Sequence, residues 1–254
     1  MKQSSRVRFL TLVLLLQAAL FAAILIREER NKIPILLSAI EPTVEERDGL
    51  NLLKSYPAES EADLKKWQEK FFKNRTIYKV IEDEEKPFLS ASSTGGSSGL
   101  YLKVNFPPAQ DLFLSWKWRA KKFPTKTNPQ KLSNRREDDF AARVYVIFPG
   151  TNFLNSEVIE YLWDEKLPPG TFASSPFSGR VKLFVIRSGR PEGDPWQEEA
   201  RNIYEDYRLL FQKEPHRAIG GIAIMSDSDN TGSQSAADYK EIAFKTKTAI
   251  QGRV

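Results

Sequence analysis

The sequence predicts a mostly β protein: an antiparallel β-sandwich of jelly-roll type with one or two packed helices and an N-terminal transmembrane helix. Two observations predict this class. After Thr76, hydrophobic and polar residues alternate in nine short segments, which clusters of Gly, Pro, Asn, Asp and Ser separate. Before them, residues 9–26 form an uncharged run that is long enough to cross a bilayer as a helix.

The apolar segment Phe9–Ile26 is expected to anchor the chain in the inner membrane. At about 1.5 Å per residue it would form a helix of roughly 27 Å. Three basic residues and no acidic one precede it, which favours a cytoplasmic N-terminus and a periplasmic C-terminal domain: Lys2, Arg6 and Arg8. The alternative is a cleaved signal peptide. A cut after Ala22 or Ala23 would place Leu20 or Phe21, instead of a small residue, three positions before it.

The rest of the chain divides into a stalk and one domain. Residues 27–58 mix charge runs with prolines and are predicted to be a stalk. Residues 59–246 are predicted to form the sandwich with a leading helix, and residues 247–254 a basic tail. The sequence has no cysteine, which excludes disulfides, thiolate metal sites and cysteine nucleophiles. The net charge is +5, yet an exported domain rarely meets nucleic acid, so we expect no such partner.

Nine strands and two helices are expected within the domain. The strands are Ile77–Glu82, Phe88–Ser92, Leu100–Asn105, Leu112–Arg119, Phe140–Phe148, Val158–Trp163, Val181–Arg187, Ile219–Met225 and Tyr239–Phe244. The first helix begins at Ser60 and carries an apolar stripe that is expected to pack in the core: Leu64, Trp67, Phe71 and Phe72. The second spans Asp194–Phe211, with Asp194 as N-cap, Pro195 in the first turn and Gln197 completing a capping box.

The strand faces supply candidate binding residues. Trp116 and Trp118 share an apolar face and are expected in the core, as are Phe140 and the alternate residues that follow it. The opposite face of that strand is either a groove for a polar ligand or a plain solvated surface. Arg187 ends an apolar face and should need a carboxylate partner, for which Asp138, Asp139 and Asp206 are the candidates. The candidate ligand-binding residues are Asp138, Asp139, Arg143, Tyr145, Tyr161, Trp163, Arg187 and Asp206, of which Tyr161 and Trp163 fit the core equally well.

The loop Asp227–Asp238 has the spacing of oxygen ligands that wrap calcium. Glycine stands at its sixth position, and the candidate ligands stand at positions one, three, five and twelve: Asp227, Asp229, Thr231 and Asp238. Expected strands flank the loop, however, where helices flank an EF-hand. Position twelve is aspartate where the EF-hand has glutamate. The alternative is an Asx-rich turn, because Asp, Asn and Gly favour turns without a metal. A bound calcium would hold the loop in place and take no part in a reaction.

Several long motifs resemble a bacterial family that is known only as domain of unknown function three-zero-four-seven. They are Leu114–Arg119, Asp138–Phe148, Tyr161–Thr171, Val185–Gly189, Glu198–Phe211 and Gly221–Gly232. The resemblance covers roughly Trp67 to Phe244 and implies an exported β-sandwich without an established activity. The segment Ala237–Lys245 is also similar to the closing strand of galactose-binding-like jelly rolls. This second similarity supports a fold more than a ligand.

Three functions remain open from the sequence. The first is a non-catalytic envelope module that binds a glycan or another envelope component. The second is a structural or assembly protein that binds a protein partner. The third is a glycan-active enzyme with paired carboxylates, although no spacing in the sequence fixes such a pair. The only histidine, His216, lies in a predicted turn, and no catalytic residue is assigned.

Overall fold

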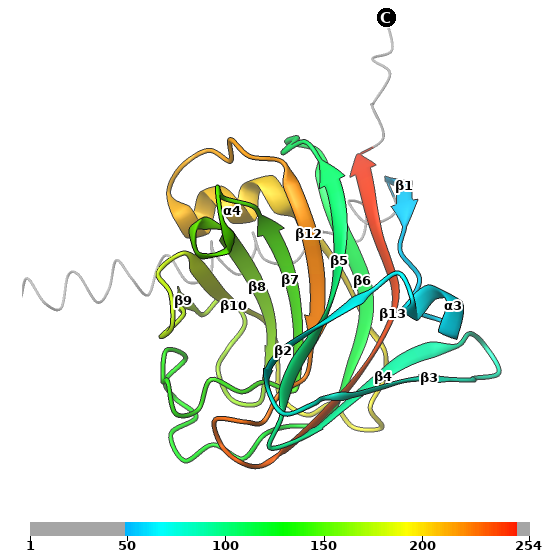
Figure 1. Ribbon diagram of the computed structural model, residues 1–254, viewed down its shortest axis with the longest axis vertical. Coiled ribbons are helices and arrows are strands. Elements are labelled where there is room, and N and C mark those ends of the chain that lie inside the picture. The colour runs from blue at the N-terminus through cyan, green and yellow to red at the C-terminus, as the bar shows by residue number, and fades with distance from the viewer. Residues whose placement is uncertain (1–48, 248–254) are drawn as a thin grey trace, which may run out of the picture. The chain divides into compact units, whose positions relative to one another are not determined.

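Two β-sheets packed face to face form the domain (Figure 1). The computed structural model describes residues 49–247. Sheet A has the order β11-β6-β13-β4-β3, with β1 also paired to β13. Its strands are β1 (Leu50–Ser55), β3 (Ile77–Ile81), β4 (Phe88–Thr94), β6 (Leu112–Lys122), β11 (Gln197–Asn202) and β13 (Gln234–Lys247). The predicted β-sandwich is therefore confirmed.

Sheet B has the order β2-β5-β12-β7-β8-β10-β9. Its strands are β2 (Gln68–Lys73), β5 (Ser97–Phe106), β7 (Ala142–Phe148), β8 (Glu157–Asp164), β9 (Phe172–Ser174), β10 (Val181–Ser188) and β12 (Ile219–Met225). All the paired strands are antiparallel except β8 and β10, which run parallel. A short 3-10 helix, η1 (Phe153–Asn155), precedes β8.

Each of the nine predicted strands is present, and the structure adds four short edge strands that the sequence pattern did not indicate: β1, β2, β9 and β11. β1 lies within the segment that was predicted to be a stalk, and it pairs with β13. The sandwich therefore extends at least to Leu50. Short edge strands have one neighbour and little buried surface, so their hydrophobic alternation is weak.

Aromatic rings that pack at tilted angles fill the space between the two sheets. Trp116 and Trp118 on β6 point inward, as predicted, and are 1% and 0% exposed. The ring centroid of Trp116 lies 5.4 Å from that of Tyr161, and the centroid of Trp118 lies 5.6 Å from that of Trp163. Tyr161 and Trp163 are 0% and 1% exposed, so both belong to this core.

The first predicted helix is much shorter than expected. Helix α3 covers only Glu61–Leu64, although Ser60 caps it as predicted and accepts a hydrogen bond from the Asp63 N–H. The chain then enters β2, which pairs with β5. Phe71 and Phe72 consequently lie on an edge strand, 59% and 64% exposed, so the predicted core stripe is wrong for both. A helix of one turn is unstable alone, and pairing with β5 gives the backbone better partners.

The second predicted helix begins eight residues later than expected. Gln197–Asn202 forms β11 against β6, and helix α4 spans Ile203–Phe211. Its N-cap is Asn202, whose side chain accepts a 3.0 Å hydrogen bond from the Glu205 N–H. Asp194 instead has a φ of +48° in the turn before β11. The strand prevails because the exposed edge of β6 offers a complete set of backbone hydrogen bonds.

The predicted membrane anchor, Phe9–Ile26, lies outside the described residues, as do most of the stalk and the tail after Lys247. Between residues 49 and 247, no helix has the length and apolar character needed to cross a membrane.

Candidate functional site

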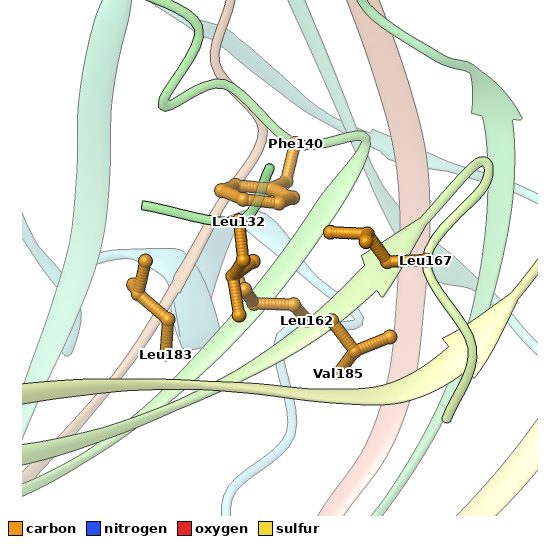
Figure 2. Close-up of a cluster of buried hydrophobic side chains, with 6 residues drawn as sticks. All are labelled: Leu132, Phe140, Leu162, Leu167, Leu183 and Val185. Carbon is orange, nitrogen blue, oxygen red and sulfur yellow. The ribbon is translucent and has the colours of Figure 1, made fainter. Parts of the chain in front are cut away.

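The chain between β6 and β7 crosses the outer face of sheet B and covers part of it. Leu132 and Phe140 from this connection pack on Leu162 of β8 and on Leu183 and Val185 of β10. Figure 2 shows Leu132 between the ring of Phe140 and the side chain of Leu162. This small second core closes the β8–β10 half of the face. The prediction that Phe140 belongs to the core between the sheets is therefore wrong, because β7 begins only at Ala142.

The other half of the face, over β5, β12 and β7, carries partly exposed aromatic residues. Tyr101 on β5 is paired with Ala223 on β12, which is paired in turn with Tyr145 on β7. Since neighbouring strands lie about 4.8 Å apart, the backbones of the two tyrosines are roughly 10 Å apart, with only a methyl group between them. We call Tyr101, Tyr145, Gly221 and Ala223 the tyrosine platform.

The ring of Tyr101 lies against the neighbouring strand, β12. A Cβ atom placed on Gly221 would lie 2.3 Å from Cε2 of Tyr101, so only glycine leaves room for the ring. The Tyr101 hydroxyl donates a 3.2 Å hydrogen bond to the Gly220 carbonyl oxygen. The ammonium of Lys70 lies 5.8 Å from the ring centroid. The ring is thus held in place on one side and partly open on the other.

A buried cluster of charges lies beside the platform. Arg143, the next outward residue of β7 before Tyr145, is 3% exposed. Its guanidinium donates to Asp227 at 2.8 Å from Nε and 2.5 Å from Nη2, and its Nη1 donates to Glu160. Nη2 also donates to the Asp138 carbonyl oxygen. One arginine thus ties β7 to β8, to the loop after β12 and to the connection that covers sheet B. We call Arg143, Asp138, Glu160 and Asp227 the Arg143 cluster.

Asp138 is the member of the Arg143 cluster with the poorest partners. Its Oδ1 atom is buried, lies 4.0 Å from Nη1 of Arg143 and accepts no hydrogen bond from the described part of the chain. Burial raises the pKa of Asp138 to about 6, and the attraction of Arg143 opposes that rise only in part. Folding therefore favours the neutral carboxyl group, which predominates in the folded protein below about pH 6.

The acidic loop brings together part of the predicted metal set. The carboxylate oxygens of Asp227 and Asp229 lie within 4.8 Å of one another and of Asp139. Thr231 donates to Asp139 from its N–H at 2.6 Å and from its hydroxyl at 2.7 Å. Asp238 lies apart, because β13 has already begun at Gln234, and it accepts a 2.7 Å hydrogen bond from Nε of Arg119. The third carboxylate beside Asp227 and Asp229 is therefore Asp139, and not Asp238 as the loop spacing predicted.

The remaining predicted site residues form separate buried pairs elsewhere. Arg187 donates to Glu199 at 2.8 Å, and none of the three predicted aspartates is its partner. A register shift in β10 after Val185 brings its side chain to β11. Asp206 accepts a 2.7 Å hydrogen bond from the Tyr161 hydroxyl and pairs with Arg201. These contacts are structural, and they lie in the core on the inner side of sheet B.

The sequence prediction missed Tyr101, Gly221 and Ala223, although signals for them exist. Alternation in the Leu100–Asn105 segment places Tyr101 on the face opposite to Leu100 and Leu102. Two consecutive glycines inside a strand, Gly220 and Gly221, indicate a place where another group approaches the backbone closely. What no pattern supplies is the order of the strands, which sets Tyr101 beside Ala223 and Tyr145.

We expect Asp138→Asn to stabilise the protein at neutral pH and to leave it unchanged near pH 4. The Asp138 pKa rises from 3.8 to about 6 on folding, so its stabilising contribution is complete below pH 3.8 and is lost as the pH rises through about 6. The asparagine variant avoids that loss, which is on the order of 2–3 kcal/mol above pH 7. Urea unfolding between these pH values measures it, with the exposed Asp83→Asn as control. An equal gain at pH 4 would contradict the prediction.

A comparison with solved structures finds chains whose backbones match this one in part. They include the N-terminal CBM22-1–GH10 modules of xylanase 10B from Clostridium thermocellum, with a TM-score of 0.39, 10% identity, and 80% of this chain and 30% of that chain covered. The xyloglucanase domain of NopAA from Sinorhizobium fredii has a TM-score of 0.41 and 9% identity, and the match covers 71% of this chain and 93% of that chain. The family 30 carbohydrate-binding module of the Clostridium thermocellum cellulase Cel9D-Cel44B has a TM-score of 0.37 and 7% identity, and the match covers 80% of this chain and 98% of that chain. TM-scores and identities this low carry no argument about function.

The comparison with curated proteins found no match. A family model does match, over residues 65–243, which is more than half of the chain and nearly the whole sandwich. Its description is "Protein of unknown function (DUF3047)". The region is nearly the same as the one over which the sequence motifs show their resemblance. The chain therefore belongs to the DUF3047 family of proteins of unknown function.

Proposed function

We propose that this protein is a non-catalytic glycan-binding protein of the cell envelope and that the tyrosine platform is its binding site. The observation that carries the proposal is the partly exposed ring of Tyr101, which lies against Gly221 beside the small side chain of Ala223. A sugar ring has an apolar C–H face, which packs well against a flat aromatic ring. The hydroxyl groups at the edge of the sugar need polar partners, and a binding site places few of these around an apolar floor.

The surroundings of the platform supply such partners. Lys103 is exposed on β5, and its register partner on β12 is Gly221. Lys70 on β2 lies over the Tyr101 ring. On the other side, Tyr145 is paired with Glu160 of the Arg143 cluster. The site thus combines two aromatic rings with two amino groups within the reach of a short oligosaccharide.

The platform is already ordered without a ligand. The Tyr101 hydroxyl is held by the Gly220 carbonyl, and the connection over sheet B is fixed by Leu132 and by the contacts of Arg143. Binding to a preorganised site loses less conformational entropy, which favours affinity. Catalysis by paired carboxylates is disfavoured, because Asp138 and Asp227 are 6% and 2% exposed and face Arg143.

We expect Tyr101→Ala to weaken glycan binding by about tenfold, since the stacking surface is lost. The measurement uses the full-length chain in detergent on an array of neutral bacterial and plant oligosaccharides and peptidoglycan fragments. Tyr204→Ala on helix α4 is the matched control, because it removes the same side chain on another surface. An array on which wild type binds nothing, or on which the two variants behave alike, would remove the support for this function.

We propose further that Phe9–Ile26 anchors the protein in the inner membrane, with the sandwich in the periplasm. The length of this uncharged segment and the basic residues before it support the proposal. Residues 27–48 then provide the connection to β1. A glycan-binding domain at that location would face the components of the envelope.

Mass spectrometry of the protein purified from the membrane fraction is expected to find peptides in which Arg27 is still joined to the apolar segment. The reason is that the segment lacks a pair of small residues before any cut. Protease added to spheroplasts should then digest the sandwich and leave the N-terminus intact. A mature N-terminus between Ala22 and Arg30 would instead identify a cleaved signal peptide.

A calcium ion held by Asp139, Asp227 and Asp229 is a second proposal, and the convergence of their oxygens favours it. Arg143 already offsets the charge of Asp227. Burial raises the pKa of Asp229, and the adjacent charge of Asp139 raises it further. Negative charge is therefore in excess at this loop, and a divalent cation with oxygen ligands would offset it. Its role would be to hold the loop between β12 and β13.

Calcium is expected to raise the melting temperature of the protein, because a ligand that binds only the folded state stabilises it by mass action. The gain is about 2.7 kcal/mol at a concentration one hundred times Kd. Asp229→Asn should abolish the gain, while Asp83→Asn, in the exposed loop before β4, should keep it. Differential scanning calorimetry with calcium and with a chelator makes the comparison. If wild type melts at the same temperature in both, the loop is a plain turn.

A further inference from the structure

A second surface lies on the opposite side of the sandwich, on the outer face of sheet A. We propose that this face binds an acidic polysaccharide of the uronate type through Arg119, Lys240 and Trp196. Arg119 comes from β6 and Lys240 from β13, two strands that lie side by side (Figure 1). Trp196 comes from the turn before β11 and lies across both. We call these three residues with the adjacent hydroxyl groups of β4 the cationic face.

Two cations converge on one indole ring. The guanidinium carbon of Arg119 lies 4.5 Å from the ring centroid of Trp196, and the ammonium of Lys240 lies 4.4 Å from it. Arg119 also lies 4.7 Å from the ring of Phe88, which packs edge-on against Trp196. These contacts hold both cations at defined places on the face, with the half-exposed indole between them.

Both cations keep hydrogen-bond donors that the described chain does not use. Arg119 gives its Nε–H to Asp238 at 2.7 Å, and its terminal nitrogens donate to no residue of the range 49–247. Within the same range Lys240 makes neither an ion pair nor a hydrogen bond, although it is only 5% exposed. An anionic group between them would accept from both, and charge-assisted hydrogen bonds are the strongest kind.

The neighbours of Lys240 increase its need for an anion. Lys240 stands directly opposite Lys117 in the β13–β6 register, and like charges in that position destabilise a sheet. Glu241 pairs directly with Lys117 at 2.9 Å, whereas Lys240 packs on the Trp196 ring and interacts with Glu241 only without direct contact. A bound carboxylate would remove this imbalance.

The hydroxyl groups of β4 on the cationic face favour a polysaccharide as the ligand. Ser90, Ser92 and Thr94 alternate along the outer side of β4, and none of their hydroxyls is hydrogen-bonded to another residue that the structure describes. They recur about every 6.6 Å, since a strand rises about 3.3 Å per residue. A chain of sugar rings offers hydroxyl partners along its length, and a uronate adds the carboxylate for Arg119 and Lys240. Trp196 then packs on the apolar face of one ring.

The test compares a charged polymer with its neutral derivative. Full-length protein in detergent is run in native gels that contain polygalacturonate or fully methyl-esterified polygalacturonate. Wild type should be retarded by the first polymer much more than by the second, and the retardation should decrease as salt is added. Lys240→Met keeps the aliphatic stem against Trp196 and removes the charge. It should weaken binding to polygalacturonate by about tenfold.

Lys166→Met is the matched control, because Lys166 is exposed in the turn after β8 and makes no side-chain contact with the described residues. Tyr101→Ala should also leave binding to polygalacturonate unchanged, which separates this face from the tyrosine platform. Near-ultraviolet circular dichroism checks that each variant is folded. If Lys240→Met does not fold, wild-type preference for the charged polymer and its loss in salt decide the matter.

Three outcomes would overturn the proposal. The first is equal retardation of wild type by the charged and neutral polymers. The second is a folded Lys240→Met variant that binds polygalacturonate as well as wild type does. The third is binding to phosphatidylglycerol vesicles that depends on Lys240 while polygalacturonate is not bound, which would assign the cationic face to a membrane surface.

Discussion

The outer face of sheet B depends on one buried guanidinium, that of Arg143. A buried arginine is stable only when carboxylate and carbonyl oxygens accept its hydrogen bonds. Removing one partner of such a buried charge lowers the stability of the folded protein by about 3–5 kcal/mol. Arg143 meets this condition by binding Asp227 from the loop after β12, Glu160 from β8 and the Asp138 carbonyl from the connection over the sheet. The same charges therefore close half of the face and leave the tyrosine platform open on the other half.

The two sheets present different chemistry on their outer sides. Sheet B shows aromatic rings over very small residues, which suits the apolar face of a sugar. Sheet A shows cations and hydroxyl groups around a single indole, which suits a charged chain. The inner sides are similar, because both contribute large aromatic residues to one core. The core sets the fold, and the outer faces are free to carry binding groups.

Sequence patterns predicted the long central strands and failed where short segments choose between two structures. Trp196 and Ala200 recur at helical spacing, yet Gln197–Asn202 pairs with the open edge of β6. The same happens at Phe71, where β2 takes the edge of β5. In both cases the local preference for helix is a few tenths of a kcal/mol per residue, and a free strand edge outweighs it. Long strands escape this competition because their alternation extends over many residues.

The sequence by itself determined the sandwich class, the buried tryptophans of β6 and the acidic character of the loop after β12, because each depends on neighbours along the chain. It also placed Arg143 and Tyr145 on the outward side of their strand. Only the tertiary structure decided that Arg187 pairs with Glu199, that Asp139 replaces Asp238 beside Asp227, and that Tyr101 and Arg119 belong to two different surfaces. The physical reason is that strand order and register bring distant residues together, and the alternation of hydrophobic and polar residues within one strand determines neither of them.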